Sequence, residues 1–223
     1  MNTFNNEFSR IANIIFDFGG LFIDVDYTLT AKTFSEKFDI PFENLYSQQQ
    51  QSDIFDKFET GKVSPADFRT YVKNILNKKH LNTKAEQNLD KEIDRCWNAM
   101  VLEYYPETFS LLEKINKHYR TFLLSNANAI HYDFFIPKLP AKLNMEGVYF
   151  SHILGLRKPD KESYEYIINK HNLKKEDTLF IDDTIQNIEG AKNVGLKTFF
   201  LDRKKGMKLT DFFDDDGVLK IKI

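Results

Sequence analysis

The sequence is poor in cysteine and has no long apolar run, and both absences narrow the possible classes of protein. A single cysteine, Cys96, excludes an intramolecular disulfide and fits a reducing compartment. No stretch approaches the roughly 20 consecutive apolar residues that a membrane-spanning helix requires. The first ten residues also lack the basic-then-apolar order of a signal peptide. We therefore predict a cytoplasmic protein with no membrane partner.

A strong charge of one sign is also lacking. The 223 residues carry 31 Lys and Arg against 33 Asp and Glu, a formal net charge of −2. No overall positive field is available to attract a polyanion, so we expect no nucleic-acid partner. The length allows one sizeable core together with a smaller inserted domain.

Short apolar segments alternate with helical segments over much of the chain. Residues 12–17 form an apolar run that ends in Asp17 and is followed by two glycines, as a buried parallel strand ends in a turn. After residue 105 the expected order is helix 107–118, strand 121–125, helix 129–136, strand 148–153, helix 160–171, strand 178–182, helix 185–194 and strand 197–201. This order predicts an α/β, Rossmann-like fold, a parallel sheet with helices on both faces.

The intervening stretch has little strand character and is expected to form successive amphipathic helices. One of them should begin at Ser64-Pro65, an N-cap residue followed by proline. We therefore predict a catalytic core made of residues 1–26 and 101–223, with an α-helical cap, residues 27–100, inserted after the first strand. Such a cap would lie as a lid over the edge of the sheet where ligands bind.

Polar residues stand at the ends of four predicted strands: Asp17, Ser125, Lys158 and the pair Asp182-Asp183. Right-handed crossovers place the carboxyl ends of parallel strands on one edge, so we expect these residues to meet there. The set suits phosphoryl transfer, because a carboxylate nucleophile must approach a phosphorus ringed by negative oxygens. Mg²⁺ and Lys158 would offset that charge, and Ser125 would hold phosphate oxygens. One of Asp182 and Asp183 should bind Mg²⁺, while the other orients a water ligand or pairs with Lys158.

The motifs IIFDFGG, LLSNAN, LRKPD and FIDDTIQNIEGAKNVG resemble, in order and spacing, those of the haloacid dehalogenase superfamily. The likeness covers the whole predicted core, and the insert resembles the helical type of cap in that superfamily. Within the superfamily the chain is most similar to bacterial sugar-phosphate phosphatases of the α-D-glucose-1-phosphate phosphatase type. That likeness also rests on FETGKVSPADF in the cap.

The resemblance implies a role for each matching residue. Asp17 would be the nucleophile and a metal ligand, and Gly19 would offer its carbonyl to the metal. Ser125 and Asn126 would hold the phosphate, which Lys158 would neutralise together with the nucleophile. The roles implied for the last motif are Asp183 as direct Mg²⁺ ligand, Asp182 as its supporting neighbour, and Asn187 as the residue that orients a metal-bound water.

The sequence departs from the superfamily at Gly19, where its phosphatases usually carry a second Asp that serves as general acid and base. The loss of such a group typically costs a factor of about 10²–10⁴ in rate. A good leaving group, such as an anomeric sugar phosphate, would reduce the need for it. Asp24, Asp26 and His131 lie nearby as substitutes, although helix capping or surface roles are the simpler interpretation of all three.

Three functions remain open on the sequence. The first is a Mg²⁺-dependent phosphatase acting on small phosphate monoesters, sugar phosphates above all, through an aspartyl-phosphate on Asp17. The second is a catalytically weak phosphate-binding or regulatory protein, which Gly19 alone supports. The third is a halide-displacing hydrolase of the 2-haloacid dehalogenase type, against which two uncompensated acids at 182–183 argue. The expected partner is a phosphorylated small molecule, and the chain could be a monomer or a homodimer.

Overall fold

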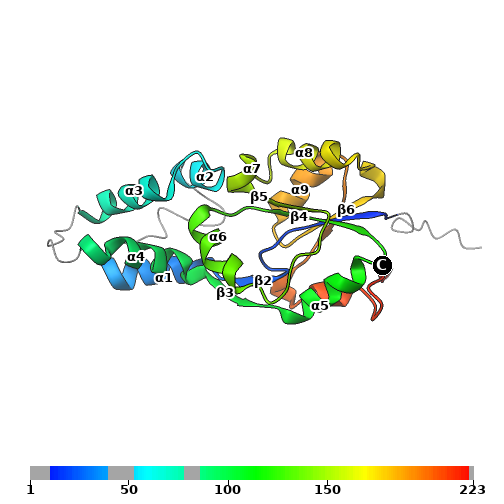
Figure 1. Cartoon of the computed structure of the whole chain (residues 1–223), viewed down its shortest axis with the longest axis horizontal. Coiled ribbons are helices and arrows are strands. Elements are labelled where there is room, and N and C mark those ends of the chain that lie inside the picture. Colours follow the sequence, from blue (N-terminus) through cyan, green and yellow to red (C-terminus); the bar gives the residue numbers. More distant parts are fainter. Residues whose placement is uncertain (1–10, 40–52, 78–85, 221–223) are drawn as a thin grey trace, which may run out of the picture.

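A computed structural model of the chain describes residues 11–39, 53–77 and 86–220. The first ten residues, whose sequence lacks a signal-peptide pattern, lie outside this range. The predicted α/β fold is confirmed: a five-stranded parallel sheet has the order β5-β4-β1-β6-β7 (Figure 1). The strands are β1 (Asn13–Phe16), β4 (Arg120–Ser125), β5 (Gly147–Phe150), β6 (Thr178–Asp182) and β7 (Lys197–Phe200).

Helices cover both faces of the sheet, because side chains alternate along each strand. Ile14 and Phe16 point to one face and pack with α5 (Pro106–Ile115), while Ile15 points to the other and packs with α8 (Lys161–His171) and α9 (Ile185–Asn193). The central strand β1 is buried along its whole length, as expected of a strand covered on both faces.

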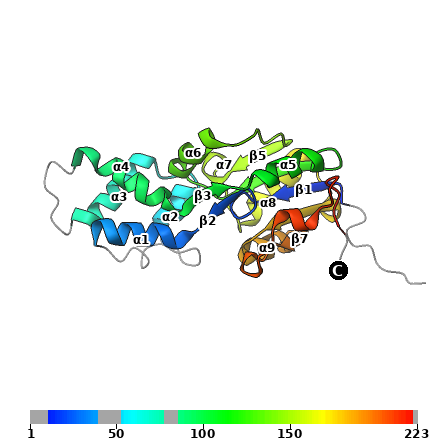
Figure 2. The same ribbon diagram turned by 90° about the horizontal axis from the view of Figure 1, so that it is seen from below.

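The helices of the cap segment lie beyond the carboxyl end of the sheet and make the molecule elongated (Figures 1 and 2). They are α1 (Tyr27–Phe38), α2 (Asp53–Glu59), α3 (Pro65–Asn77) and α4 (Glu86–Trp97), followed by the 3₁₀ helix η2 (Asn98–Met100). The predicted start of α3 is confirmed, since Ser64 Oγ accepts the Asp67 N–H at 3.1 Å. These helices pack around an apolar cluster that includes Phe55, Phe68 and Trp97, and to which Ile130 from outside the segment also belongs. That the segment acts as a separate domain stays a prediction.

Two short strands join this segment to the sheet. β2 (Ile23–Val25) leads out and β3 (Val101–Tyr104) leads back, and they pair antiparallel. The strand β3 was not predicted from the sequence, because its burial pattern has no strict alternation. The pair places both connections side by side.

One predicted strand is too long. Residues 148–153 were expected to be extended, but β5 ends at Phe150 and the short helix α7 (Ser151–Leu154) follows. Ser151 Oγ accepts the Ala127 N–H at 2.9 Å and donates to the Ala127 carbonyl at 3.0 Å. These bonds draw the chain out of the sheet, a competition between side chain and backbone that local pattern does not reveal.

The helices of the described segments are all too short or too polar to cross a membrane.

Candidate active site

The strand register brings the predicted polar residues to one edge of the sheet. Phe16 at the end of β1 is level with Leu123 of β4 and Ile181 of β6. Asp17 continues β1, and its N–H donates to the Ile181 carbonyl at 2.9 Å. The next residue of β6 is Asp182, so Asp17 and Asp182 emerge side by side although 165 positions separate them in the sequence.

Lys158 lies between these two carboxylates. Its Nζ is 2.8 Å from Asp17 Oδ1 and 2.6 Å from Asp182 Oδ2, and the side chain is only 1% exposed. Burial opposes its charge, but the two carboxylates outweigh burial and raise the pKa of Lys158. The ammonium therefore stays protonated as a fixed positive charge beside Asp17.

Asn126 holds the backbone of Lys158. Its Nδ2 donates to the Lys158 carbonyl at 2.8 Å, and its Oδ1 accepts the Lys158 N–H at 2.9 Å. Both polar atoms of this side chain are thus engaged in fixing the loop. Ser125, at the end of β4, is buried and lines a smaller cavity next to Asn126.

The two adjacent acids differ in their surroundings. Asp182 accepts from Lys158 Nζ, from Asn187 Nδ2 at 3.0 Å and from the Thr184 N–H at 2.7 Å, so both its oxygens are used. Within the described part of the chain, the Asp183 carboxylate accepts a single side-chain hydrogen bond, from the Thr184 hydroxyl at 3.3 Å. Asp182 is therefore the partner of Lys158, and Asp183 is the acid with oxygen lone pairs to spare.

The three carboxylates carry more negative charge than Lys158 can balance. One oxygen each from Asp17, Asp182 and Asp183 lies within 4.8 Å of the others. Burial, reinforced by repulsion from Asp182, raises the pKa of Asp17 to about 8 and that of Asp183 to about 6. Such crowded, buried carboxylate oxygens are the ligand type that Mg²⁺ prefers, so the residues present fit this ion.

Gly19 and Gly20 follow Asp17 closely in the sequence, and they differ in whether the structure requires a glycine there. Gly20 has φ +71°, and a Cβ there would lie 2.1 Å from Asp183 Oδ2, so the acid can approach the turn only because the position is glycine. Gly19 has no left-handed backbone, and a Cβ there would meet only Val25 Cγ2, at 3.5 Å. Neither conformation nor space therefore demands the glycine that replaces the usual acid.

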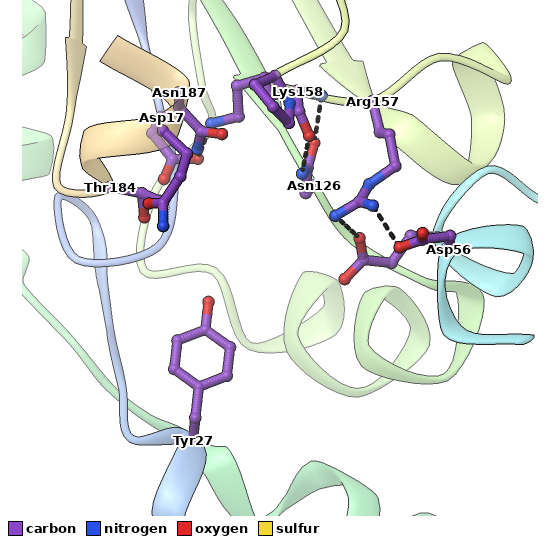
Figure 3. A pocket seen from close by; sticks show the side chains of 11 residues that line it. Asp17, Tyr27, Asp56, Asn126, Arg157, Lys158, Thr184 and Asn187 are labelled. Carbon is purple, nitrogen blue, oxygen red and sulfur yellow. Dashed lines mark hydrogen bonds and ion pairs between the residues drawn. The ribbon is translucent and has the colours of Figure 1, made fainter. Parts of the chain in front are cut away.

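A cleft of about 280 Å³ opens over these groups, between the sheet edge and the cap helices (Figure 3). Asp17, Lys158 and Asn187 line its floor, and Tyr27 points toward them from the start of α1. Arg157 lines one wall, where it forms ion pairs with Asp56 and with Glu59, the latter at 2.9 Å.

Tyr27, Asp56, Glu59 and Arg157 also line the cleft, and no role was predicted for them from the sequence. Asp56 and Glu59 stand one position after Phe55 and Phe58, which are buried in the cap cluster. The sequence offered two weak signals for them. One is a basic residue directly before Lys158, and the other is a set of polar residues between phenylalanines, a pattern that any solvent-exposed helix face shows.

None of the three nearby substitutes is placed as a neutral-pH acid for the missing group. Asp26 caps α1 by accepting the Thr28 N–H at 2.9 Å. Burial raises the pKa of Asp24, but hydrogen bonds from Arg203 and Tyr105 outweigh it and hold the pKa below its usual range. His131 is buried rather than at the surface, and burial lowers its pKa to about 3. The capping interpretation of Asp26 is confirmed, and the surface interpretation of His131 is wrong.

Comparison with known proteins agrees with this geometry. The model of the haloacid dehalogenase-like hydrolases matches residues 11–195, more than half of the chain. The chain belongs to the haloacid dehalogenase-like hydrolase family. The family resemblance read from its motifs is thereby confirmed, and the chain is an enzyme of the hydrolase class.

Relatives of this haloacid dehalogenase-like hydrolase cover nearly its whole length. D-ribitol-5-phosphate phosphatase from Bacteroides thetaiotaomicron is 27% identical over 195 residues, which are 85% of this chain and 91% of that protein. A family enzyme from the same organism, crystallised with magnesium and inorganic phosphate, is 27% identical and superposes with a TM-score of 0.76, covering 92% of this chain and 100% of that one. A family hydrolase from Porphyromonas gingivalis superposes with a TM-score of 0.72 at 27% identity, over 86% of this chain and 91% of that one.

Proposed function

We propose that the chain is a Mg²⁺-dependent phosphatase that hydrolyses small phosphate monoesters, sugar or sugar-alcohol phosphates above all. The observation that carries this proposal is the position of Lys158 Nζ, 2.8 Å from Asp17 Oδ1 and 2.6 Å from Asp182 Oδ2, on the floor of the cleft. A buried carboxylate beside a fixed cation can attack an anionic phosphorus. The phosphatase relative and the relative crystallised with magnesium and phosphate support the same chemistry.

In the proposed reaction Asp17 attacks the phosphorus. A bond forms from its carboxylate oxygen to phosphorus, the bond to the ester oxygen breaks, and the leaving oxygen takes up a proton from water. Water then attacks the phosphorus of the aspartyl-phosphate, which releases inorganic phosphate and restores the Asp17 carboxylate. Lys158 offsets the charge that gathers on the phosphoryl oxygens, and Ser125 with neighbouring backbone N–H groups would hold them.

Mg²⁺ would be held by the Asp17 and Asp183 carboxylates and the Gly19 carbonyl, and when bound it supplies the positive charge that Lys158 alone does not. Asp182, already engaged by three donors, supports Lys158. Asn187 donates to Asp182 and lines the cleft, which suits a residue that orients a water near the ion.

We also infer that residues 27–100 form a cap that covers the cleft of the core made of residues 1–26 and 101–223. The antiparallel β2–β3 pair joins the two parts, and Arg157 contacts α2 across the cleft. A cap of this kind excludes water from the reacting centre. The free thiol of Cys96, buried in α4, supports a cytoplasmic location.

The test is phosphate release from p-nitrophenyl phosphate and a panel of sugar phosphates, with Mg²⁺ or with EDTA. We expect Mg²⁺-dependent turnover that falls at least about 10³-fold in Asp17→Asn. Asp215→Asn, the same change at an exposed turn near the C-terminus, is the matched control and should keep full activity. Activity that survives in Asp17→Asn would refute the nucleophile, and EDTA-insensitive turnover would refute the metal requirement.

Gly19 favours one second candidate, a regulatory protein that binds phosphate esters without hydrolysing them. In that case calorimetry would show sugar-phosphate binding, while the panel would give no phosphate release. Halide release from 2-haloacids in EDTA would instead indicate a dehalogenase.

A further inference from the structure

A second cavity, of about 70 Å³, adjoins the catalytic cleft and shares Tyr27, Glu59 and Asn126 with it. Its remaining walls are mostly apolar and come from the turn after β1, the β2–β3 pair, η2 and helix α6 (Ala129–Phe135). Because Phe18 and Ser125 also line it, the cavity begins directly beside the nucleophile and the end of β4. It therefore extends the cleft beside Asp17, toward the β2–β3 pair and η2.

His131 is a polar group of this cavity that the proposed mechanism does not use. The residue is 8% exposed, and its ring stacks on Trp97 with centroids 5.1 Å apart and planes 6° apart. Nδ1 lies 2.9 Å from Asn98 Oδ1, whereas Nε2 is buried with no hydrogen-bond partner in the described part of the chain. A buried polar atom without a partner is uncommon and calls for an explanation.

The contact with Asn98 decides which nitrogen of the His131 ring carries the proton. An amide oxygen can only accept a hydrogen bond, so Nδ1 must donate and Nε2 must hold the free lone pair. The same burial that lowers the pKa of His131 to about 3 keeps the ring neutral. Nε2 is thus an acceptor at neutral pH, and its missing partner is a donor such as a hydroxyl group.

The charges around the cavity restrict what can enter it. None of its lining residues in the described segments is Lys or Arg, and its one carboxylate is Glu59. A carboxylate or second phosphate there would meet no unpaired cation, because Arg157 beside the cavity already pairs with Asp56 and Glu59. Walls that are partly apolar, with an unpartnered acceptor at His131, instead suit a neutral carbon chain that bears hydroxyl groups.

We propose that His131 Nε2 accepts a hydrogen bond from a hydroxyl group of the substrate, and that this cavity selects neutral, hydroxylated leaving groups over acidic ones. This inference rests on the proposed phosphatase function and assigns its substrate class: sugar or polyol phosphates rather than phosphorylated acids. His131 is then a specificity-determining residue, held in position by Trp97 and Asn98.

The test uses two variants that separate the two ring nitrogens. His131→Asn can keep a donor near the Nδ1 position, facing Asn98, but has no group at Nε2. His131→Gln loses the contact with Asn98 but can place an amide oxygen near Nε2. His118→Asn, at an exposed histidine whose Nε2 contacts the Asp216 carbonyl, is the control.

For each protein, kcat/KM is measured with D-ribitol 5-phosphate, D-glucose 6-phosphate and phosphoglycolate, each relative to p-nitrophenyl phosphate. We expect the wild type to prefer a hydroxylated ester over phosphoglycolate. The preference for hydroxylated esters should fall about three- to tenfold in His131→Asn, the effect of one neutral hydrogen bond, and recover in part in His131→Gln. It should stay constant in His118→Asn.

The outcomes separate this inference from the proposed function. If the wild type hydrolyses none of the four esters, the phosphatase function is wrong and the inference falls with it. If the wild type hydrolyses esters but prefers phosphoglycolate, only the inference is wrong. The same holds if His131→Asn changes all four rates by one common factor, because a merely structural role would do that.

Discussion

The side chain of Asn126 bonds both backbone polar groups of Lys158, accepting from its N–H at 2.9 Å and donating to its carbonyl at 2.8 Å. Asn126 follows β4 and Lys158 stands in the loop after α7, so this pair ties two loops of the active site together. The resemblance to known phosphatases suggested a phosphate contact for Asn126. Its side-chain contacts make it a positioning residue for the lysine that neutralises the phosphate.

We expect Asn126→Ala to lower kcat/KM about 10- to 100-fold, because a catalytic group displaced by about 1 Å loses roughly that much. Asn126→Asp should be at least as impaired, since a carboxylate oxygen would face the Lys158 carbonyl. Asn169→Ala, at an exposed position of α8, is the control. Steady-state kinetics of the three variants check this, and rates within twofold of wild type in Asn126→Ala would contradict the positioning role.

The two adjacent acids should respond in opposite ways to removal of charge. Asp182→Asn puts an amide among three donors and leaves buried Lys158 with Asp17 alone, so the free energy of unfolding should fall by about 3 kcal/mol or more. Asp183→Asn relieves repulsion instead and should leave stability equal or higher in EDTA. It should also raise the Mg²⁺ concentration needed for half-maximal activity at least about tenfold. Urea unfolding in EDTA and Mg²⁺ titrations of activity measure both effects, and reversed results would exchange the two roles.

Gly19 and Gly20 offer a matched pair of substitutions. Gly19→Ala should change the free energy of unfolding by less than about 1 kcal/mol, because its Cβ would meet only Val25. Gly20→Ala should abolish activity and destabilise the protein, since φ +71° disfavours a side chain and its Cβ would lie 2.1 Å from Asp183 Oδ2.

Gly19→Asp would return a carboxyl group to the position that lacks the general acid. We expect it to raise kcat on esters with poor leaving groups by up to about 10²-fold, with a smaller gain on p-nitrophenyl phosphate, which needs no acid. Equal changes on both kinds of ester would show that the substitution acts only by altering the cavity next to Val25.

Arg157 connects the core to the cap through Asp56 and Glu59 of α2. If these ion pairs hold the cleft closed, Arg157→Ala should raise KM about three- to tenfold, because substrate-positioning contacts at the mouth are lost. Arg69→Ala is the control, since Arg69 makes a similar pair with Asp94, at 2.8 Å, wholly within the cap helices. Kinetics and melting temperatures of both variants distinguish loss of closure from loss of cap stability.

His131 also predicts how stability depends on pH. Its pKa is about 3 in the folded protein and about 6.5 when exposed, so its contribution is complete above pH 6.5 and is lost as the pH falls toward 3. Each pH unit in that window costs up to about 1.4 kcal/mol, hence about 2 kcal/mol between pH 6.5 and 5. Urea unfolding at both pH values should show this loss in the wild type and in His118→Asn. A clearly smaller loss is expected in His131→Asn, and an identical loss there would contradict the burial of a neutral ring.

The sequence by itself determined the order of strands and helices, the helical nature of the insert, and the four polar positions at the strand ends. These features rest on local signals: apolar runs such as that before Asp17, and the cap-and-proline pair Ser64-Pro65. The topology of parallel sheets then implies that Asp17, Lys158 and Asp182 meet. The strand β3 and the end of β5 were missed, because tertiary hydrogen bonds set these short elements.

The tertiary structure decided which partner each polar group takes. Lys158 forms its ion pair with Asp182 rather than with Asp183. The Asn126 side chain bonds the backbone of Lys158, and Arg157 forms an ion pair with Asp56, 101 positions away in the sequence. Such contacts depend on which side chains the fold brings within about 3 Å, and no periodicity in the chain encodes that distance. The same reason explains His131. A helix position in a sequence says nothing about burial against Trp97, yet that burial makes its Nε2 an acceptor without a partner.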